Sequence, residues 1–154
     1  MDDLIGIAPT EHDLDNAEKA VERKVELDKR GRPTNMLGME LHWSEGKVIL
    51  TQTRLIDSMC SQYLEKDESS GGIRSLPLNT VFYARTDPTS EDTPPPKYQA
   101  IVGGLLFIVR MSRPEISVHV NLLGRRTKDA SPENWKAALT VLRYLRSTKH
   151  DGLT

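Results

Sequence analysis

Hydrophobic and polar residues follow two different rhythms at the start of the chain. The apolar run over residues 4–8 is short and unbroken, which predicts a buried strand. Further on, Leu14, Ala17 and Val21 recur at intervals of three and four residues among charged positions. That spacing places one apolar stripe along a helix, so a helix is predicted over about residues 11–24.

Two more elements are predicted before residue 66. Residues 35–52 alternate at a period of about two on either side of Ser44-Glu45-Gly46, which predicts a β-hairpin. The next segment returns to helical spacing and predicts a helix over about residues 53–66. Its apolar face consists of Leu55, Ile56, Met59, Cys60 and Tyr63.

The pattern disappears over residues 67–96, which are rich in proline, glycine, serine and acidic residues, and returns as helices afterwards. Residues 97–111 are largely apolar, a break at Ser112-Arg113-Pro114-Glu115 follows, and a second helix is predicted over 116–126. Ser131-Pro132 then opens a third helix, with the serine as its cap. The predicted fold class is α+β: a strand–helix–hairpin–helix piece at 1–66, a linker at 67–96, and a three-helix unit at 97–154.

Charge is distributed unevenly between the two ends of the chain. Residues 1–96 carry 11 Lys/Arg against 18 Asp/Glu, whereas residues 97–154 carry 10 against 4. A basic C-terminal part suits a phosphate backbone or an acidic partner, although an ordinary solvated helical surface is equally compatible with it.

Composition excludes several classes of protein. The single Cys60 rules out an internal disulfide, and no Cys/His cluster has zinc spacing. The apolar run over 101–109 is about half of what a membrane span needs. Acidic residues stand where a secretory signal would be basic. We therefore expect an intracellular protein, in the cytoplasm or nucleus, that is neither secreted nor membrane-bound.

Several short motifs follow one another with plausible gaps: "DDLIGIA", "MLGMEL…GKVILTQTRLIDSM", "SLPLN", "YQAIVGGLLFIVRMSRPEI" and "PENWKAALTVLRYLRST". In this order they resemble the reverse transcriptase of copia-type LTR retrotransposons. The resemblance runs from the end of the polymerase palm through the thumb to the start of the connection. It implies a parent RNA-directed DNA polymerase whose partner is an RNA/DNA template–primer duplex.

The resemblance implies a metal-binding role for the first two acidic residues. Asp2 and Asp3 correspond to the second half of the family's aromatic-x-Asp-Asp turn, which holds Mg²⁺ (or Mn²⁺) in the parent. The fingers and the palm strand with a further carboxylate would lie upstream of Met1. We therefore expect this chain alone to be inactive and to bind no metal tightly. Without the resemblance, two aspartates at this position are also typical of a hydrated chain terminus.

The predicted hairpin resembles the primer grip, which positions the 3′ end of the primer. Leu37, Gly38, Met39 and Trp43 would form it, although a glycine in a strand is often a bulge and Trp43 also suits simple hydrophobic cover. Two further basic residues lie where such polymerases meet the incoming triphosphate, or else at a solvated turn. These are Lys29 and Arg30.

The C-terminal helices carry the cations that a thumb would turn towards phosphates. For Arg113, beside Pro114 and Glu115, a structural role at the helix start is the stronger alternative. A non-catalytic, retrotransposon-derived binding module is the rival hypothesis for the whole chain, and exposed strand edges predict self-association. The candidate nucleic-acid-binding residues here are Arg110, Arg113, Arg125, Arg126, Lys128, Lys136, Arg143 and Arg146.

Overall fold

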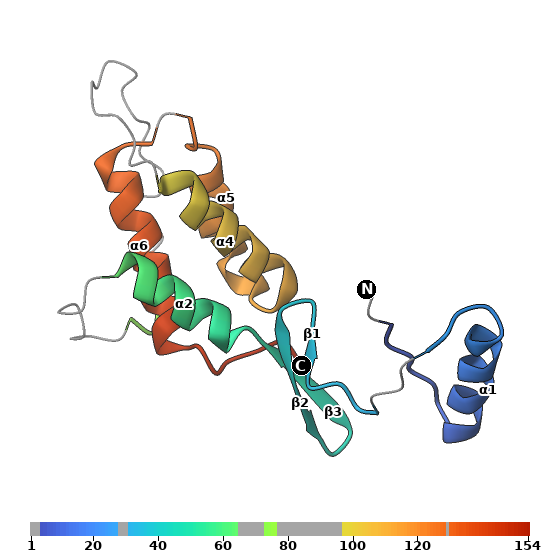
Figure 1. The fold of residues 1–154 in the computed structure, drawn as a ribbon. Coiled ribbons are helices and arrows are strands. Elements are labelled where there is room, and N and C mark those ends of the chain that lie inside the picture. The colour runs from blue at the N-terminus through green and yellow to red at the C-terminus, as the bar shows by residue number, and fades with distance from the viewer. Residues whose placement is uncertain (1–3, 28–30, 65–72, 77–96, 129) are drawn as a thin grey trace.

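The computed structural model describes residues 4–27, 31–64, 73–76, 97–128 and 130–154. Within these ranges the fold is α+β, as predicted, with helices packed together and an antiparallel sheet at one end of them (Figure 1). The elements are, in order, α1 (Glu11–Glu22), β1 (Asn35–Met36), β2 (Met39–Ser44), β3 (Lys47–Thr51), α2 (Thr53–Tyr63), α4 (Tyr98–Met111), the 3₁₀ turn η1 (Pro114–Ile116), α5 (Ser117–Gly124) and α6 (Pro132–Ser147).

One hydrophobic core joins α2, α4, α5 and α6. Gly104 permits the close approach of α2 to α4, because a Cβ there would lie 2.7 Å from the Cε of Met59. The hydroxyl of the buried Tyr98 donates to the carbonyl of Leu123, at 2.9 Å. Since α2 supplies Ile56, Met59 and Cys60 to this core, α2 packs together with the helices of 97–154.

The predicted hairpin is confirmed as β2 and β3, which pair in antiparallel register with Leu41 opposite Leu50. The short β1 adds a third strand on the other side of β2. The C-terminal tail reaches the outer edge of β3, where Leu153 and Leu50 exchange two backbone hydrogen bonds of 2.8 and 3.1 Å. A Cβ on Gly152 would lie 2.4 Å from the Leu50 carbonyl oxygen, so glycine is required for this approach.

The helix α2 begins with a cap supplied by the sheet rather than by its own N-cap residue. The side chain of Gln52 makes no capping bond. Instead, the Glu40 carboxylate on β2 accepts from the backbone N–H of Thr53 at 2.8 Å and of Arg54 at 3.2 Å. A carboxylate there also complements the positive end of the helix dipole, so Glu40 ties the sheet to the helical core.

The helix α6 begins as predicted. Ser131 is its N-cap, Pro132 stands at the first helical position, and Asn134 completes a capping box by bonding back to the serine. The prediction that residues 4–8 form a buried strand is wrong, because no strand is assigned there and Leu4 and Ile7 are 69% and 90% exposed. A strand needs a neighbour for its backbone hydrogen bonds, and among the described residues none pairs with this segment.

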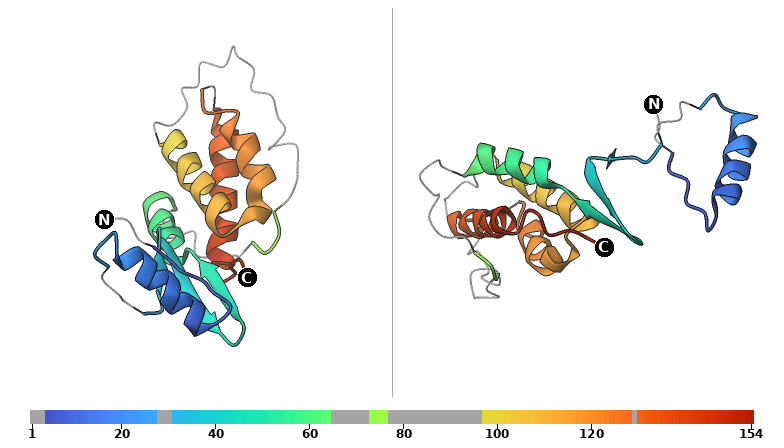
Figure 2. Two further views of the ribbon diagram at one scale, coloured as in Figure 1. Left: turned by 90° about the vertical axis from the view of Figure 1, so that its right-hand side faces the viewer. Right: turned by 90° about the horizontal axis from the view of Figure 1, so that it is seen from below.

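The predicted first helix is present as α1, but its apolar stripe is not buried in the core. No residue of α1 is buried, and the helix stands apart from the helical body (Figures 1 and 2). Leu14 contacts the preceding segment, because a Cβ on Gly6 would lie 3.0 Å from its Cδ1 atom. The amphipathic pattern therefore predicted the helix correctly, although its apolar stripe contributes no residue to the core.

Candidate nucleic-acid interface

The turn between β1 and β2 consists of Leu37 and Gly38, both with positive φ, at 48° and 79°. Met36 and Met39 pair directly across it, so this is a two-residue hairpin turn of the kind that requires left-handed backbone at both positions. Glycine adopts that conformation freely, whereas leucine rarely does. The primer-grip-like segment is therefore a tight turn with an exposed leucine at its tip, and not a bulge.

This turn lies against α4. A Cβ on Gly38 would be 3.7 Å from the Phe107 ring, and Phe107 itself is 40% exposed. Met39, the next predicted site residue, is buried behind the turn. The exposed surface therefore runs from Leu37 directly onto α4.

Trp43 lies towards the other end of β2, on the outside of the sheet. Its indole N–H donates to the carbonyl of Pro33 at 2.7 Å, and the Arg32 guanidinium lies 5.5 Å from its ring centroid. The residue is 39% exposed. These contacts hold the segment that precedes β1, so the structure gives Trp43 a supporting role and leaves the residue partly open to solvent.

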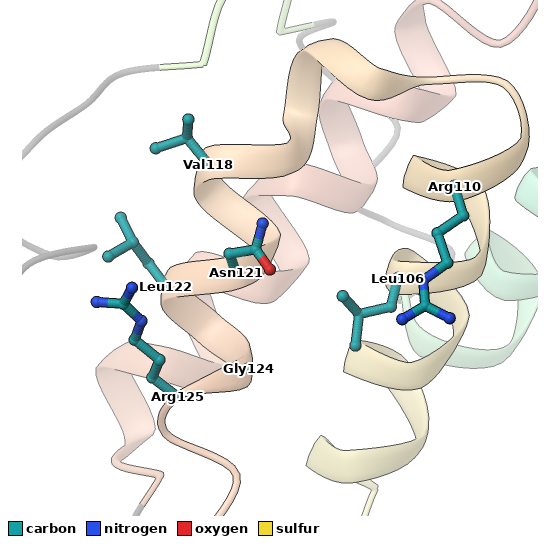
Figure 3. A pocket seen from close by; sticks show the side chains of 7 residues that line it. All are labelled: Leu106, Arg110, Val118, Asn121, Leu122, Gly124 and Arg125. Carbon is teal, nitrogen blue, oxygen red and sulfur yellow. The ribbon is translucent and has the colours of Figure 1, made fainter.

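A groove of about 610 Å³ lies between α4 and α5 (Figure 3). Arg110, near the end of α4, and Arg125, just past the end of α5, lie at its two ends because the helices run in opposite directions. Both arginines are exposed to solvent. The remaining lining is Leu106, Val118, Asn121, Leu122 and Gly124. Arg110 and Arg125 were predicted as site residues. The apolar and amide residues of the lining were not predicted, because in the sequence they look like the ordinary buried side of a helix.

The other predicted cations fall into two groups. Lys128 and Lys136 are exposed, and they contribute general positive charge to the C-terminal helices. Arg126, Arg143 and Arg146 are partly buried, and each already has an interaction within the protein.

Arg113 is different, because it is only 2% exposed. Its guanidinium donates to the Thr148 carbonyl at 2.8 Å and to the Thr148 hydroxyl at 2.7 Å, and it also bonds the Glu115 carboxylate. It lies 5.5 Å from the Tyr144 ring centroid. A side chain so enclosed is unavailable to a phosphate, so we exclude Arg113 from the interface; its contacts match the structural alternative.

Four predicted site residues lie outside the described residues: Asp2, Asp3, Lys29 and Arg30. Among the residues that the structure does describe, no group of three or more His, Cys, Asp or Glu side chains is placed to hold a metal ion.

Two buried titratable groups lie in the helical core. Burial raises the pKa of the Cys60 thiol, with Arg146 opposing the shift, so this cysteine is a poor nucleophile near neutral pH. Burial also lowers the pKa of His119 on α5, which keeps the imidazole neutral. Both groups behave as core side chains.

The chain resembles proteins encoded by transposons over nearly its whole length. It is 29% identical over 155 residues to a putative transposon Ty5-1 protein of Saccharomyces cerevisiae, an alignment that covers 97% of this chain and 48% of that protein. It is 22% identical over 158 residues to the retrovirus-related Pol polyprotein from transposon TNT 1-94 of Nicotiana tabacum, covering 99% of this chain and 12% of the polyprotein. These relatives make it a retrotransposon-derived protein.

The retrotransposon origin expected from the sequence is thus confirmed. The chain spans about half the length, or less, of these relatives. A shorter match, 36% identity over 56 residues, links it to the secreted RxLR effector protein 161 of Plasmopara viticola and covers 36% of this chain and 39% of that protein. No family model matches the chain, and no solved structure matches it. Among the described residues, no helix has the length and apolar character to cross a membrane.

Proposed function

We propose that this retrotransposon-derived chain is part of a reverse transcriptase and contacts the template–primer duplex through a continuous surface on the hairpin and α4. The motif order supports this, and so does the similarity to a Pol polyprotein. The chain would represent the end of the palm, the thumb and the start of the connection. Its contribution to polymerisation would be to hold the duplex in position.

The observation that carries the proposal is the contact between the hairpin turn and α4. Gly38 lies against Phe107, and Arg110 follows Phe107 by one helical turn on α4. From Arg110 the groove continues to Arg125. The hairpin turn and the cationic groove therefore both lie along α4, an arrangement that would suit a surface that positions a duplex through its backbone.

Arg110 and Arg125 suit phosphate contact on electrostatic grounds. Both are exposed, and no salt bridge to an acidic residue involves either of them within the described ranges. Guanidinium groups bind phosphate oxygens through two parallel hydrogen bonds. Such contacts carry no base information, so binding should depend on salt and not on sequence.

Fluorescence anisotropy with a labelled RNA–DNA hybrid between 50 and 200 mM salt tests this. The logarithm of the association constant should fall as the logarithm of the salt concentration rises. Replacing both Arg110 and Arg125 by alanine should make this slope shallower by about two, because each lost phosphate contact releases about 0.9 fewer counterions. Lys47→Ala combined with Arg74→Ala is the matched control, because it also removes two positive charges and both residues are exposed outside the groove. Equal losses in the control and the double variant, or binding that ignores salt, would refute the proposal.

For catalysis, we propose that Asp2 and Asp3 are an inherited part of a magnesium site whose further carboxylate comes from elsewhere in the polymerase. The chain alone would then extend no primer with Mg²⁺ or Mn²⁺. An extension assay with the purified chain and with Asp2→Asn checks this directly. Primer extension that Asp2→Asn abolishes would show a complete catalytic centre and contradict the proposal.

A second candidate is a non-catalytic, retrotransposon-derived binding module. The local match to an effector protein favours it, because a related segment occurs in a protein that is not named as a polymerase. Both candidates use the same exposed surface, but only the first requires preference for a recessed primer end. Equal affinity for a blunt hybrid and a primer–template of the same length would favour the second candidate.

A further inference from the structure

The lining of the α4–α5 groove follows a pattern along one face of α5. Four of its residues recur at intervals of three, one and three positions, so they share one side of the helix. They are Val118, Asn121, Leu122 and Arg125. Arg110 completes the pattern from α4, and Asn121 lies between the two arginines (Figure 3). The groove is therefore cationic at both ends, with an amide in the middle and apolar side chains beside it.

The side-chain amide of Asn121 is available to a ligand. Asn121 is exposed, and within the described ranges its side chain makes no hydrogen bond. Its backbone carbonyl is occupied, because it accepts from the backbone N–H of Arg125 at 3.2 Å. An asparagine amide offers two donor hydrogens and an acceptor oxygen. The groove thus holds, between its two cations, a neutral group that can bond a ligand hydroxyl in either direction.

A ribonucleotide strand presents the matching order of groups. Its phosphates are anionic, and the sugar between them offers apolar C–H faces and a 2′-hydroxyl that both donates and accepts. From Val118 to Arg125 the helix advances about 10 Å, whereas successive nucleotides of one strand advance by about 3.4 Å, so the groove accommodates about three nucleotides. None of the described residues that line it is acidic, so no carboxylate there repels the phosphates.

We propose that the α4–α5 groove receives the RNA strand of the duplex and that Asn121 hydrogen-bonds a ribose 2′-hydroxyl there. This inference rests on the proposed duplex contact and extends it, because Arg110 and Arg125 would meet the phosphates of RNA and DNA alike. Deoxyribose has no 2′-hydroxyl, so a DNA strand in the groove would leave the amide without this bond. Asn121 is then the residue that distinguishes RNA from DNA, while the arginines supply affinity.

Three duplexes of one sequence and length separate recognition of the hydroxyl from recognition of duplex shape. The first is an RNA–DNA hybrid, and the second is a DNA duplex. The third is a hybrid whose ribonucleotide strand carries 2′-fluorine in place of the hydroxyl, which keeps the sugar geometry of RNA. In fluorescence anisotropy the full chain should bind the RNA–DNA hybrid about three- to tenfold more tightly than either of the others, as one net hydrogen bond provides.

Two matched variants assign the preference to the amide. Asn121→Leu removes the amide at nearly constant side-chain size, so it should bind all three duplexes equally, with the affinity that the wild type shows for DNA. Gln62→Leu is the control, because Gln62 is an exposed amide on α2 outside the groove, and it should keep the wild-type preference. Circular dichroism should show equal helicity in both variants, since neither amide is buried.

The outcomes separate this proposal from the duplex contact on which it rests. Equal wild-type affinity for the RNA–DNA hybrid and the DNA duplex would overturn the role of Asn121 and leave the phosphate contacts standing. Equal affinity for the hydroxyl and fluorine hybrids, or an unchanged preference in Asn121→Leu, would do the same. A chain that binds no duplex, or that loses no affinity when Arg110 and Arg125 both become alanine, would refute the duplex contact itself and this proposal with it.

Discussion

Removing the Glu40 carboxylate should destabilise the joint between the sheet and the helical core. The carboxylate is 14% exposed and accepts three hydrogen bonds, from the N–H groups of Thr53 and Arg54 and from the Thr51 hydroxyl at 3.1 Å. An unsatisfied buried donor costs about 1–3 kcal/mol, and losing a helix cap costs about 0.5–2 kcal/mol. Water reaches part of this site, so we expect Glu40→Ala to lower the free energy of unfolding by about 2–4 kcal/mol.

The variant Glu40→Gln distinguishes the contribution of the negative charge from that of the hydrogen-bond acceptor. The amide keeps one oxygen but loses the negative charge at the helix N-terminus, so its cost should be about 1–2 kcal/mol. Urea denaturation followed by tryptophan fluorescence measures both variants. Trp135 on α6 reports the docking of α2, because its ring packs edge-on against Tyr63 at 6.1 Å.

The control for this series is Glu45→Ala, at the exposed turn of the hairpin. A surface change of this kind should alter the free energy of unfolding by less than about 0.5 kcal/mol. If Glu40→Ala cost no more than Glu45→Ala, the capping role assigned to Glu40 would be wrong.

Three further predictions concern the same body. Arg113→Lys keeps the charge but loses the paired hydrogen bonds to Thr148, so it should lower the free energy of unfolding, measured by urea denaturation, by about 1–3 kcal/mol. A decrease below about 0.5 kcal/mol would contradict the structural role assigned to these bonds. Gly152→Ala should break the pairing of the tail with Leu50, seen as faster hydrogen exchange at the Leu50 amide, and unchanged exchange would disprove the required close approach. The lowered pKa of His119 means that the unfolded chain takes up a proton first as pH falls below about 6.5. Stability should therefore be fully present above that pH and decline below it, and His119→Gln should flatten the decline; an identical acid profile in the variant would exclude His119 as its source.

Local patterns predicted most of the elements correctly. The helices α1, α2, α4, α5 and α6 and the β2–β3 hairpin follow spacings that depend on a few neighbouring residues. The start of α6 was also predictable, because the serine and proline that begin it act within one turn. Such features need no knowledge of which segments pack together.

Features that depend on distant segments could not be predicted. Glu40 caps a helix that begins 13 residues later, and Leu50 pairs with a residue more than 100 positions away. Residues 4–8 have the composition of a strand but have no neighbour to pair with among the described residues. The same limit applies to the interface, because exposure distinguishes Arg110 from the enclosed Arg113 only once the helices are packed.

Site-specific crosslinking tests the central claim, that the hairpin turn meets the primer end and the α4–α5 groove follows the duplex. Leu37→Cys and Asn121→Cys place an exposed thiol at each position, and Cys60 should stay unmodified because it is buried with a raised pKa. With a photo-crosslinker attached, position 37 should link to the 3′-terminal primer nucleotide, and position 121 to nucleotides inside the duplex. Lys47→Cys, at the far turn, should link to neither. Identical crosslinks from all three positions, or none to the primer end from position 37, would contradict the account.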